Sequence, residues 1–128
     1  MSTRQTILLV EDISKLLEYR LEDEGYNVLC AYDVESGLSI IDEKRDLISL
    51  VCLDIILPKS KDNQEIDDQG GFKIAKHIPK SIPFIFISVY ERSSEILEGE
   101  RLGVRAFFTK PYDTLDVVNK IKEILRNE

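Results

Sequence analysis

The sequence has few of the residues from which metal centres, disulfide frameworks and catalytic triads are usually built. Among its 128 residues are two cysteines, one histidine and no tryptophan. Two cysteines cannot form a disulfide framework, and because Cys30 and Cys52 both lie in apolar runs we expect two buried thiols in a reducing compartment. A zinc site needs more ligands than these cysteines and His77 provide. We expect His77 at a solvated helix end, on the opposite edge of the fold from the acidic residues described below, which excludes a Ser-His-Asp triad.

Long hydrophobic runs and an excess of basic residues are also missing. No apolar run approaches the roughly 20 residues of a membrane-spanning helix, and residues 1–10 lack the pattern of a secretory signal. We therefore expect a cytoplasmic protein with no membrane contact. The chain carries 17 basic and 24 acidic residues, a net charge of −7, so direct nucleic acid binding is not expected. Neither a G-x-G-x-x-G nor a G-x-x-x-x-G-K-[ST] motif is present to hold a nucleotide.

What the sequence does contain is a regular alternation of short apolar runs and amphipathic stretches. A hydrophobic fraction of 43% and a charged fraction of 32% fit one globular domain, which we place at residues 1–128. Strands are predicted at residues 7–10, 27–31, 48–53, 83–88 and 105–109. Helices are predicted at residues 14–24, 34–43, 71–78, 93–102 and from 114 onwards.

Caps and inward faces can be assigned to several of these helices. Asp33 and Asp113 are predicted N-caps, and Gly25 and Gly103 are predicted to end the helices that precede them. Spacing predicts that the first and last helices bury the following side chains: Ile13, Leu16, Leu17, Leu21, Leu115, Val118, Ile121 and Leu125.

The strand–helix alternation, repeated five times, predicts an α/β fold. Such a chain forms a parallel sheet with helices on both faces, and right-handed crossovers make the sheet doubly wound. Ligands of doubly wound sheets bind beyond the carboxyl ends of the strands. The residues that follow each strand are therefore the candidates for a functional site.

Acidic and polar residues follow four of the five predicted strands. Glu11 and Asp12 follow the first, Asp54 follows the third, Ser88 ends the fourth, and Lys110 comes just after the fifth. An oxygen-only cluster of three carboxylates suits Mg²⁺, with Mn²⁺ as an alternative. The ammonium and hydroxyl groups would complete a socket for a tetrahedral anion placed on one carboxylate.

At these residues the chain resembles the receiver domains of two-component response regulators. The resemblance covers essentially the whole chain and rests on four segments in order at the expected strand ends: Glu11-Asp12, residues 53–58 (Leu-Asp-Ile-Ile-Leu-Pro), residues 84–88 (Phe-Ile-Phe-Ile-Ser) and residues 103–111 (Gly-Val-Arg-Ala-Phe-Phe-Thr-Lys-Pro). It implies a flavodoxin-like (βα)5 fold with a five-stranded sheet in the order 2-1-3-4-5.

The resemblance also implies a role for each matching residue. Asp54 would be the phosphoacceptor, and Lys110 and Ser88 would contact the phosphoryl group. The implied metal ligands are Glu11, Asp12, Asp54 and the backbone carbonyl of Ile56. Ser88 and Phe107 would form the conformational switch. A cis peptide bond is implied between Lys110 and Pro111.

The implied function is that of a phosphorylated signalling switch rather than an enzyme acting on a separate substrate. The implied phosphodonor is a histidine kinase or a histidine phosphotransfer protein, and the output goes to a downstream protein or output domain. One alternative is a pseudo-receiver that acts as a phosphorylation-independent interaction module. Another is a small flavodoxin-like cofactor protein, although Glu11-Asp12 would repel a cofactor phosphate.

The segment at about 59–70 departs most from the family pattern. The glycine that normally follows Pro58 within a few residues is here delayed to Gly70 or Gly71, and the intervening loop has no period. Either this loop is a disordered excursion with no role, or its acidic side chains restrict which phosphodonors reach Asp54. These side chains are Asp62, Glu65, Asp67 and Asp68. Two further departures, Val89 after Ser88 and the large residues Ile56 and Tyr90 beside the site, bear on phosphorylation kinetics.

Overall fold

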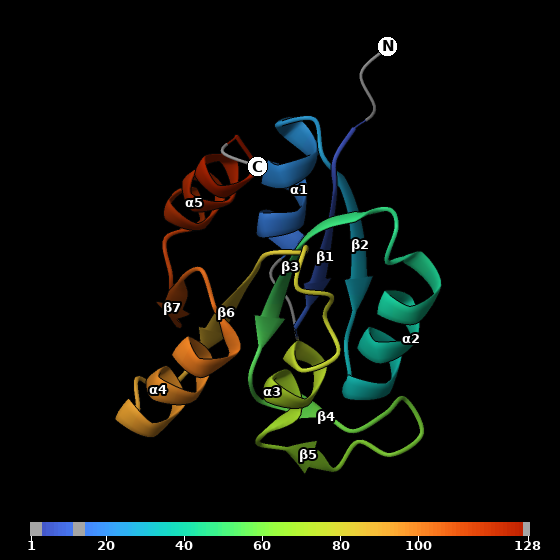
Figure 1. Cartoon of the computed structure of the whole chain (residues 1–128), viewed down its shortest axis with the longest axis vertical. Helices are drawn as coiled ribbons and strands as arrows, with labels where there is room; N and C mark the ends of the chain where they lie inside the picture. Colours follow the sequence, from blue (N-terminus) through green and yellow to red (C-terminus); the bar gives the residue numbers. More distant parts are fainter. Residues whose placement is uncertain (1–3, 12–14, 127–128) are drawn as a thin grey trace.

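A computed structural model describes residues 4–11 and 15–126 and contains the predicted doubly wound sheet (Figure 1). All pairs in the five-stranded sheet are parallel, and the strand order is β2-β1-β3-β6-β7. Since β6 and β7 are the fourth and fifth strands of this sheet along the chain, the order is the expected 2-1-3-4-5. The strands are β1 (Thr6–Val10), β2 (Asn27–Ala31), β3 (Ile48–Asp54), β6 (Phe84–Ser88) and β7 (Phe107–Thr109).

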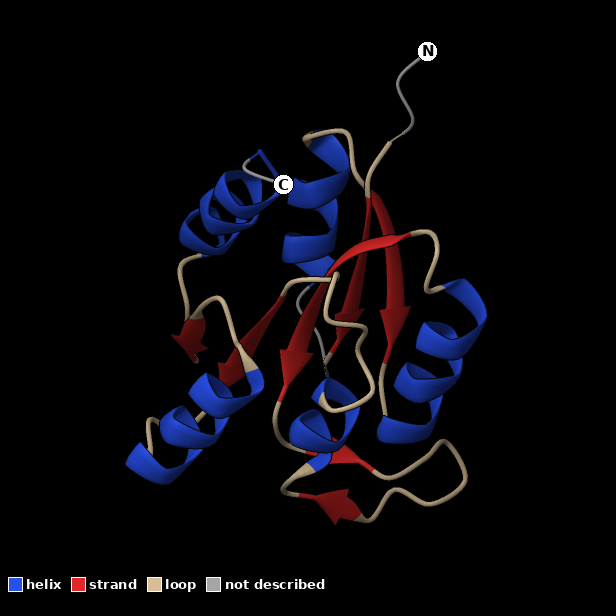
Figure 2. Cartoon of the chain, in the orientation of Figure 1, coloured by secondary structure: helices blue, strands red, loops and turns tan. Residues whose placement is uncertain are grey.

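Helices cover both faces of this sheet (Figure 2). They are α1 (Lys15–Asp23), α2 (Val34–Lys44), α3 (Gly70–Ala75), α4 (Ser93–Leu102) and α5 (Thr114–Arg126). One face carries α1 and α5, and the other carries α2, α3 and α4. None of the helices within the described residues is long and apolar enough to span a membrane.

The central strands divide their side chains between two separate cores. On β1, Leu8 and Val10 contribute to the core under α2 and α3, while Ile7 and Leu9 contribute to the core under α1 and α5. This alternation follows from the two-residue period of a strand, and it explains why the central strands read as unbroken apolar runs. Phe107 and Phe108 also point to opposite faces, as expected.

The predicted caps are confirmed. Asp33 Oδ1 accepts a hydrogen bond from the backbone N–H of Ser36 at 2.7 Å, and Asp113 Oδ1 accepts one from Leu115 at 2.8 Å. Gly25 and Gly103 have φ angles of 97° and 88°, the left-handed conformation that glycine adopts without strain at a helix end.

Several predicted details are wrong. Leu16 and Leu115 are exposed by 51% and 57%, because each lies in the first turn of its helix and the buried stripe runs along the neighbouring positions. Cys30 is half-buried rather than buried, since β2 is an edge strand, whereas Cys52 on β3 is fully buried. The last strand begins at Phe107 rather than at residue 105, and α3 ends at Ala75 rather than at residue 78. The predicted inward residue Ile13 lies outside the described residues.

The predicted irregular loop contains a small antiparallel hairpin. Strand β4 (Leu57–Pro58) pairs with β5 (Ile66–Asp67), and the Lys59 N–H donates to the Glu65 carbonyl at 2.9 Å. The hairpin is joined to α2 through a hydrogen bond from the Glu35 N–H to the Lys59 carbonyl at 3.1 Å. Residues 57–67 are therefore connected to the rest of the fold by backbone hydrogen bonds. This segment lies at the carboxyl edge of the sheet (Figure 1).

Candidate functional site

Asp54 and Lys110 form a close ion pair at the carboxyl edge of the sheet. Asp54 ends β3, Lys110 follows β7, and Lys110 Nζ lies 2.6 Å from Asp54 Oδ2. Asp54 is only 5% exposed, and its Oδ1 accepts a hydrogen bond from the Ile56 N–H at 3.2 Å. The peptide bond between Lys110 and Pro111 is cis, as the resemblance implies.

The electrostatics of Asp54 are dominated by its burial. Burial raises the pKa of this carboxyl above the usual 3.8, while the hydrogen bond and charge of Lys110 and the N–H groups of Ile56 and Ile55 lower it. The net direction is upward, so one ammonium group does not fully compensate the buried negative charge. A further cation beside Asp54 is therefore favourable.

Glu11 brings a second carboxylate to the same edge. Val10 and Leu53 are partners in the parallel register, so Glu11 and Asp54 follow at adjacent strand ends, where neighbouring strands lie about 4.8 Å apart. Glu11 is 1% exposed. Burial is the main cause that raises the pKa of the Cys52 thiol, but the charges of Glu11 and Asp54 raise it further, so both carboxylates act on the same small volume.

Asp12, the remaining predicted metal ligand, lies outside the described residues. Within residues 4–11 and 15–126 no group of three acidic, histidine or cysteine side chains is close enough to hold a metal ion. Among the predicted ligands, the structure describes Glu11, Asp54 and Ile56, all at the carboxyl ends of β1 and β3.

Ser88 lies at the end of the next strand and is completely buried. Its Oγ accepts a hydrogen bond from the Tyr90 N–H at 3.2 Å, and its carbonyl accepts one from the Lys110 N–H at 2.7 Å. The second bond fixes the end of β7, and with it Lys110, beside the end of β6. Phe107 is half-buried on β7, with its ring 6.2 Å from that of Phe86. Of the predicted switch residues, Ser88 thus ends β6, the strand next to β3, and Phe107 begins β7, the edge strand beyond β6.

Gly71 holds the segment after Asp54 against α3, a role that the sequence did not reveal. Its N–H donates to the Ile55 carbonyl at 2.8 Å, and a Cβ atom built on Gly71 would lie 2.3 Å from the Asp54 carbonyl oxygen. Only glycine permits this approach of a helix to the backbone of the site. The delayed pair Gly70-Gly71 was visible in the sequence, but the atoms that it meets were not.

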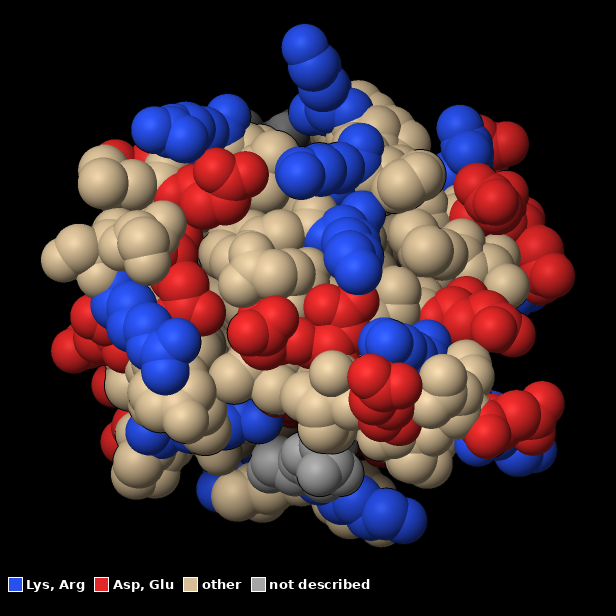
Figure 3. Space-filling model, turned by 90° about the horizontal axis from the view of Figure 1, so that it is seen from below, with Lys and Arg blue, Asp and Glu red and all other residues tan. Residues whose placement is uncertain are grey.

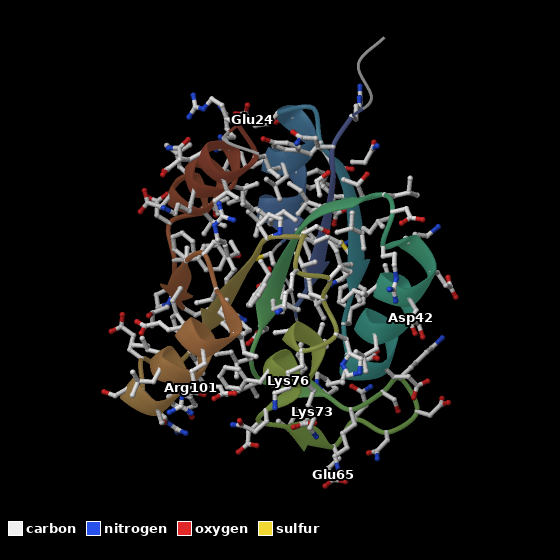
Figure 4. All side chains as sticks on the ribbon, in the orientation of Figure 1. Glu24, Asp42, Glu65, Lys73, Lys76 and Arg101 are labelled. Atoms are coloured by element: carbon white, nitrogen blue, oxygen red, sulfur yellow. The ribbon has the colours of Figure 1, made fainter. Side chains whose placement is uncertain are left out.

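The hairpin carries less uncompensated negative charge than its sequence suggests. Glu65 pairs with Lys59 at 3.2 Å, and Asp67 pairs with Lys73 of α3 at 2.6 Å (Figure 4). Asp67 is 9% exposed and also accepts a hydrogen bond from the Gln69 N–H, so it holds the hairpin in place. Viewed from the carboxyl edge, acidic and basic side chains are interspersed (Figure 3). Any restriction of phosphodonors by charge would therefore depend on the other two acidic residues, Asp62 and Asp68.

Of the residues that depart from the family pattern beside the site, Ile56 is partly buried against the core, whereas Val89 and Tyr90 are exposed. Val89 is 50% exposed and Tyr90 is 43% exposed, with the guanidinium of Arg92 stacked 4.0 Å from the centre of the Tyr90 ring. His77 is exposed near the end of α3, and its Nδ1 lies 2.9 Å from the Lys73 carbonyl. Asp54 is paired with Lys110, and Ser88 Oγ accepts from the Tyr90 N–H, so none of the contacts described for these two side chains involves His77.

Comparisons with known proteins agree with this architecture. The family described as "response regulator receiver domain" matches residues 7–122. A CheY-like receiver domain protein from Methanospirillum hungatei JF-1 is 26% identical, with a TM-score of 0.81, over 98% of this chain and 96% of that chain. A putative response regulator from Chloroflexus aurantiacus J-10-fl is 25% identical, with a TM-score of 0.76, over 97% and 99%. The non-phosphorylated HemR receiver domain from Leptospira biflexa, at 24% identity and a TM-score of 0.78 over 96% and 94%, shares the fold.

Proposed function

We propose that this chain, which belongs to the family of response regulator receiver domains, is a signalling switch that accepts a phosphoryl group on Asp54. The observation that carries the proposal is the buried ion pair between Asp54 and Lys110, 2.6 Å long, at the carboxyl edge of the sheet. A buried carboxylate held by one ammonium group is oriented for attack, and its partner is placed to meet the incoming charge.

The reaction that these residues support is an in-line phosphoryl transfer. A carboxylate oxygen of Asp54 attacks the phosphorus of a phosphohistidine, the P–N bond breaks, and the imidazole leaves with the bond's electron pair. The product is an acyl phosphate. Lys110 exchanges its contact with the carboxylate for one with a phosphoryl oxygen, so the ammonium group stays paired. Such catalysis consists almost entirely of positioning and charge stabilisation.

A divalent metal ion is part of this proposal, with Mg²⁺ as the expected ion. The donors at the site are all oxygens, from Glu11, Asp54 and the Ile56 carbonyl, and the raised pKa of Asp54 favours added positive charge. Asp12 completes the proposed ligand set from outside the described residues. When bound, Mg²⁺ would neutralise charge on the transferred phosphoryl oxygens.

The proposed switch follows from the position of Ser88. Its hydroxyl oxygen is occupied by the Tyr90 N–H, and drawing the hydroxyl towards a phosphoryl group on Asp54 would break this bond and shift the segment that leads into α4. Space vacated beside β6 would then be filled by Phe107, which is half-buried at the edge of the core. We propose that a downstream protein or output domain reads this change.

The proposed phosphodonor is a histidine kinase or histidine phosphotransfer protein, and the proposed location is the cytoplasm. The domain would act on no separate substrate, and we propose no direct contact with nucleic acid or membrane. Purified protein without flavin absorbance would argue against a flavodoxin-like cofactor protein.

Intact-mass spectrometry with Mg²⁺ and a small phosphodonor tests the proposed function. We expect one added phosphoryl group in the wild type and in the matched control Asp62→Asn, and none in Asp54→Asn or with EDTA. Asp54→Asn keeps the size of the side chain, so a failure to modify it would not reflect a lost fold. An unmodified wild type would instead support a phosphorylation-independent interaction module.

A further inference from the structure

The two longest stretches of the chain without acidic residues border one surface hollow. No Asp or Glu occurs in residues 69–90 or in residues 101–112, although the whole chain contains 24 acidic residues and has a net charge of −7. These stretches carry six basic residues, namely Lys73, Lys76, Lys80, Arg101, Arg105 and Lys110. Positive charge is therefore segregated within an acidic protein.

The hollow lies between the segment after α3 and the end of α4, and its volume is about 300 Å³. Pro83 and Phe84 line it, so it lies beside the amino end of β6, at the opposite end of that strand from Ser88. Its lining combines apolar side chains, including Ile78, Ile82, Phe84 and Leu102, with basic ones from Lys80, Arg101 and Arg105. We call this hollow the amino-edge cleft.

The amino-edge cleft continues into a second hollow. This neighbour has a volume of about 400 Å³, is lined by Arg45, Asp46, Ser49 and Ser81 among others, and shares Ile82 and Pro83 with the cleft. Two neighbouring hollows that share lining residues suit an extended segment better than a single compact ligand.

Arg101 and Lys80 place exposed positive charges at the rim of the cleft. The side chain of Arg101 is 78% exposed, and its contact with Glu98 of the same helix is a loose 3.6 Å pair on the surface (Figure 4). Lys80 is exposed and follows Pro79 directly. Exposed ion pairs of this kind contribute little to stability. A closer carboxylate of a partner can therefore replace the contact of Arg101 with Glu98.

We propose that the amino-edge cleft is a docking site for an acidic protein segment that carries an apolar anchor. Carboxylates of the segment would meet Lys80 and Arg101, while one aliphatic or aromatic side chain would pack into the hollow above Ile82 and Phe84. Charge complementarity favours this occupant, because a basic segment would meet the like charges of Lys80 and Arg101. Nucleic acid is disfavoured by the net charge of −7.

The docking site is independent of the proposed phosphorylation. It lies at the amino end of β6, while Ser88 lies at the carboxyl end of the same strand. From Phe84 to Ser88, a distance of four residue steps, a strand extends about 13 Å. A segment in the cleft would therefore leave the Asp54 edge open to a phosphodonor.

Nuclear magnetic resonance titration of the isotopically labelled wild-type domain tests this proposal. The probe is a short capped peptide of Asp and Glu with one central Phe. We expect saturable shifts at the amides of Ile82, Phe84, Leu102 and Val104. A peptide with Gly in place of Phe, and one with Lys in place of the acidic residues, should not produce them.

Charge-reversal variants show whether the cleft is the binding site. Lys80→Glu combined with Arg101→Glu should weaken peptide binding about tenfold, because two exposed charge contacts become repulsive. The matched control, Lys15→Glu combined with Arg20→Glu on α1, changes the net charge equally and should alter the affinity less than about twofold. Circular dichroism checks that both variants are folded.

Four outcomes would overturn the proposal. These are no saturable shift with the Phe peptide, equal binding of the Gly peptide, an equal loss of affinity in both double variants, or shifts at the same amides on dilution of the domain alone. The last outcome, with self-association in sedimentation, would assign the cleft to a second copy of this chain.

Discussion

Replacing Gly71 by alanine tests how the segment that carries the proposed acceptor is held in place. Gly71 lies in the first turn of α3, and a Cβ atom there would be 2.3 Å from the Asp54 carbonyl oxygen and 2.6 Å from the Ile55 Cα. Both are backbone atoms, so the contact can be relieved only if α3 or the segment after β3 moves. The φ angle of Gly71 is not positive, so the effect is steric rather than conformational.

The expected loss of stability follows from two opposing contributions. Alanine in a helix interior is favoured over glycine by about 0.5–1 kcal/mol. Overpacking a well-packed region typically costs about 1–3 kcal/mol. The cost for Gly71→Ala should lie at the upper end, because the new Cβ meets backbone atoms of Asp54 and Ile55 that cannot rotate away. We therefore expect Gly71→Ala to lower the free energy of unfolding by about 2 kcal/mol.

A second glycine in a helix provides the matched control. A Cβ atom on Gly37 in α2 would also meet a close neighbour, at 2.9 Å, but that neighbour is Cδ1 of Ile74, the far end of a flexible side chain. We expect Gly37→Ala to stay within about 1 kcal/mol of the wild type, because a rotamer change of Ile74 offsets the gain in helix propensity.

Urea unfolding followed by far-ultraviolet circular dichroism measures both variants, and the chain has no tryptophan to serve as a fluorescent probe. If Gly71→Ala is as stable as the wild type, or no less stable than Gly37→Ala, then the segment after β3 is not fixed by this close approach.

Three further predictions concern the hairpin and the switch. Asp67→Asn should lower the free energy of unfolding at neutral pH by about 1 kcal/mol, since the Lys73 side chain is half-exposed. Burial raises the pKa of Asp67, but its hydrogen bonds, chiefly the one from Lys73, outweigh burial and lower the pKa from 3.8. The stability advantage of the wild type over Asp67→Asn should therefore be present above pH 3.8 and vanish as the pH falls through the lower pKa of the folded state. Unfolding at a series of acidic pH values measures this advantage, and an advantage that stays constant with pH would contradict the assignment. Replacing Asp62 and Asp68 by Asn should raise the rate of modification by a small anionic phosphodonor at low salt. The difference in rate from the wild type should shrink as added salt shortens the Debye length, which is about 10 Å at 0.1 M. Equal rates at all salt concentrations would show that these charges do not restrict the phosphodonor. Ser88→Ala should still accept a phosphoryl group but lose the hydrogen-exchange response of α4, and an unchanged response would remove Ser88 from the switch.

The sequence predicts the strands well where burial determines their pattern. The central runs of β1, β3 and β6 are apolar without interruption because both faces are covered, and their ends are marked by Glu11, Asp54 and Ser88. Asp33 and Gly103 likewise mark helix ends through local hydrogen bonding and backbone conformation, which depend on few neighbours. The fold class and the gathering of site residues follow from these local signals.

What the sequence does not reveal depends on contacts between distant residues. The hairpin of β4 and β5 is held by the Asp67–Lys73 ion pair and by the hydrogen bond from the Glu35 N–H to the Lys59 carbonyl. Neither contact leaves a periodic pattern in the sequence. Leu115 has the spacing of an inward residue, but its place in the first turn of α5 leaves it exposed. The amino-edge cleft is similarly invisible until the fold brings the two acid-free stretches together.

Chemical localisation of the phosphoryl group tests the central claim most directly. The wild-type domain is treated with Mg²⁺ and a small phosphodonor, reduced with borohydride, and mapped by peptide mass spectrometry. Borohydride reduces an acyl phosphate to an alcohol, so the acceptor aspartate becomes homoserine while unmodified carboxylates survive. We predict homoserine at residue 54 alone. Homoserine at another position, or a phosphoryl group that withstands base and borohydride, would contradict the assignment of Asp54 as the acceptor.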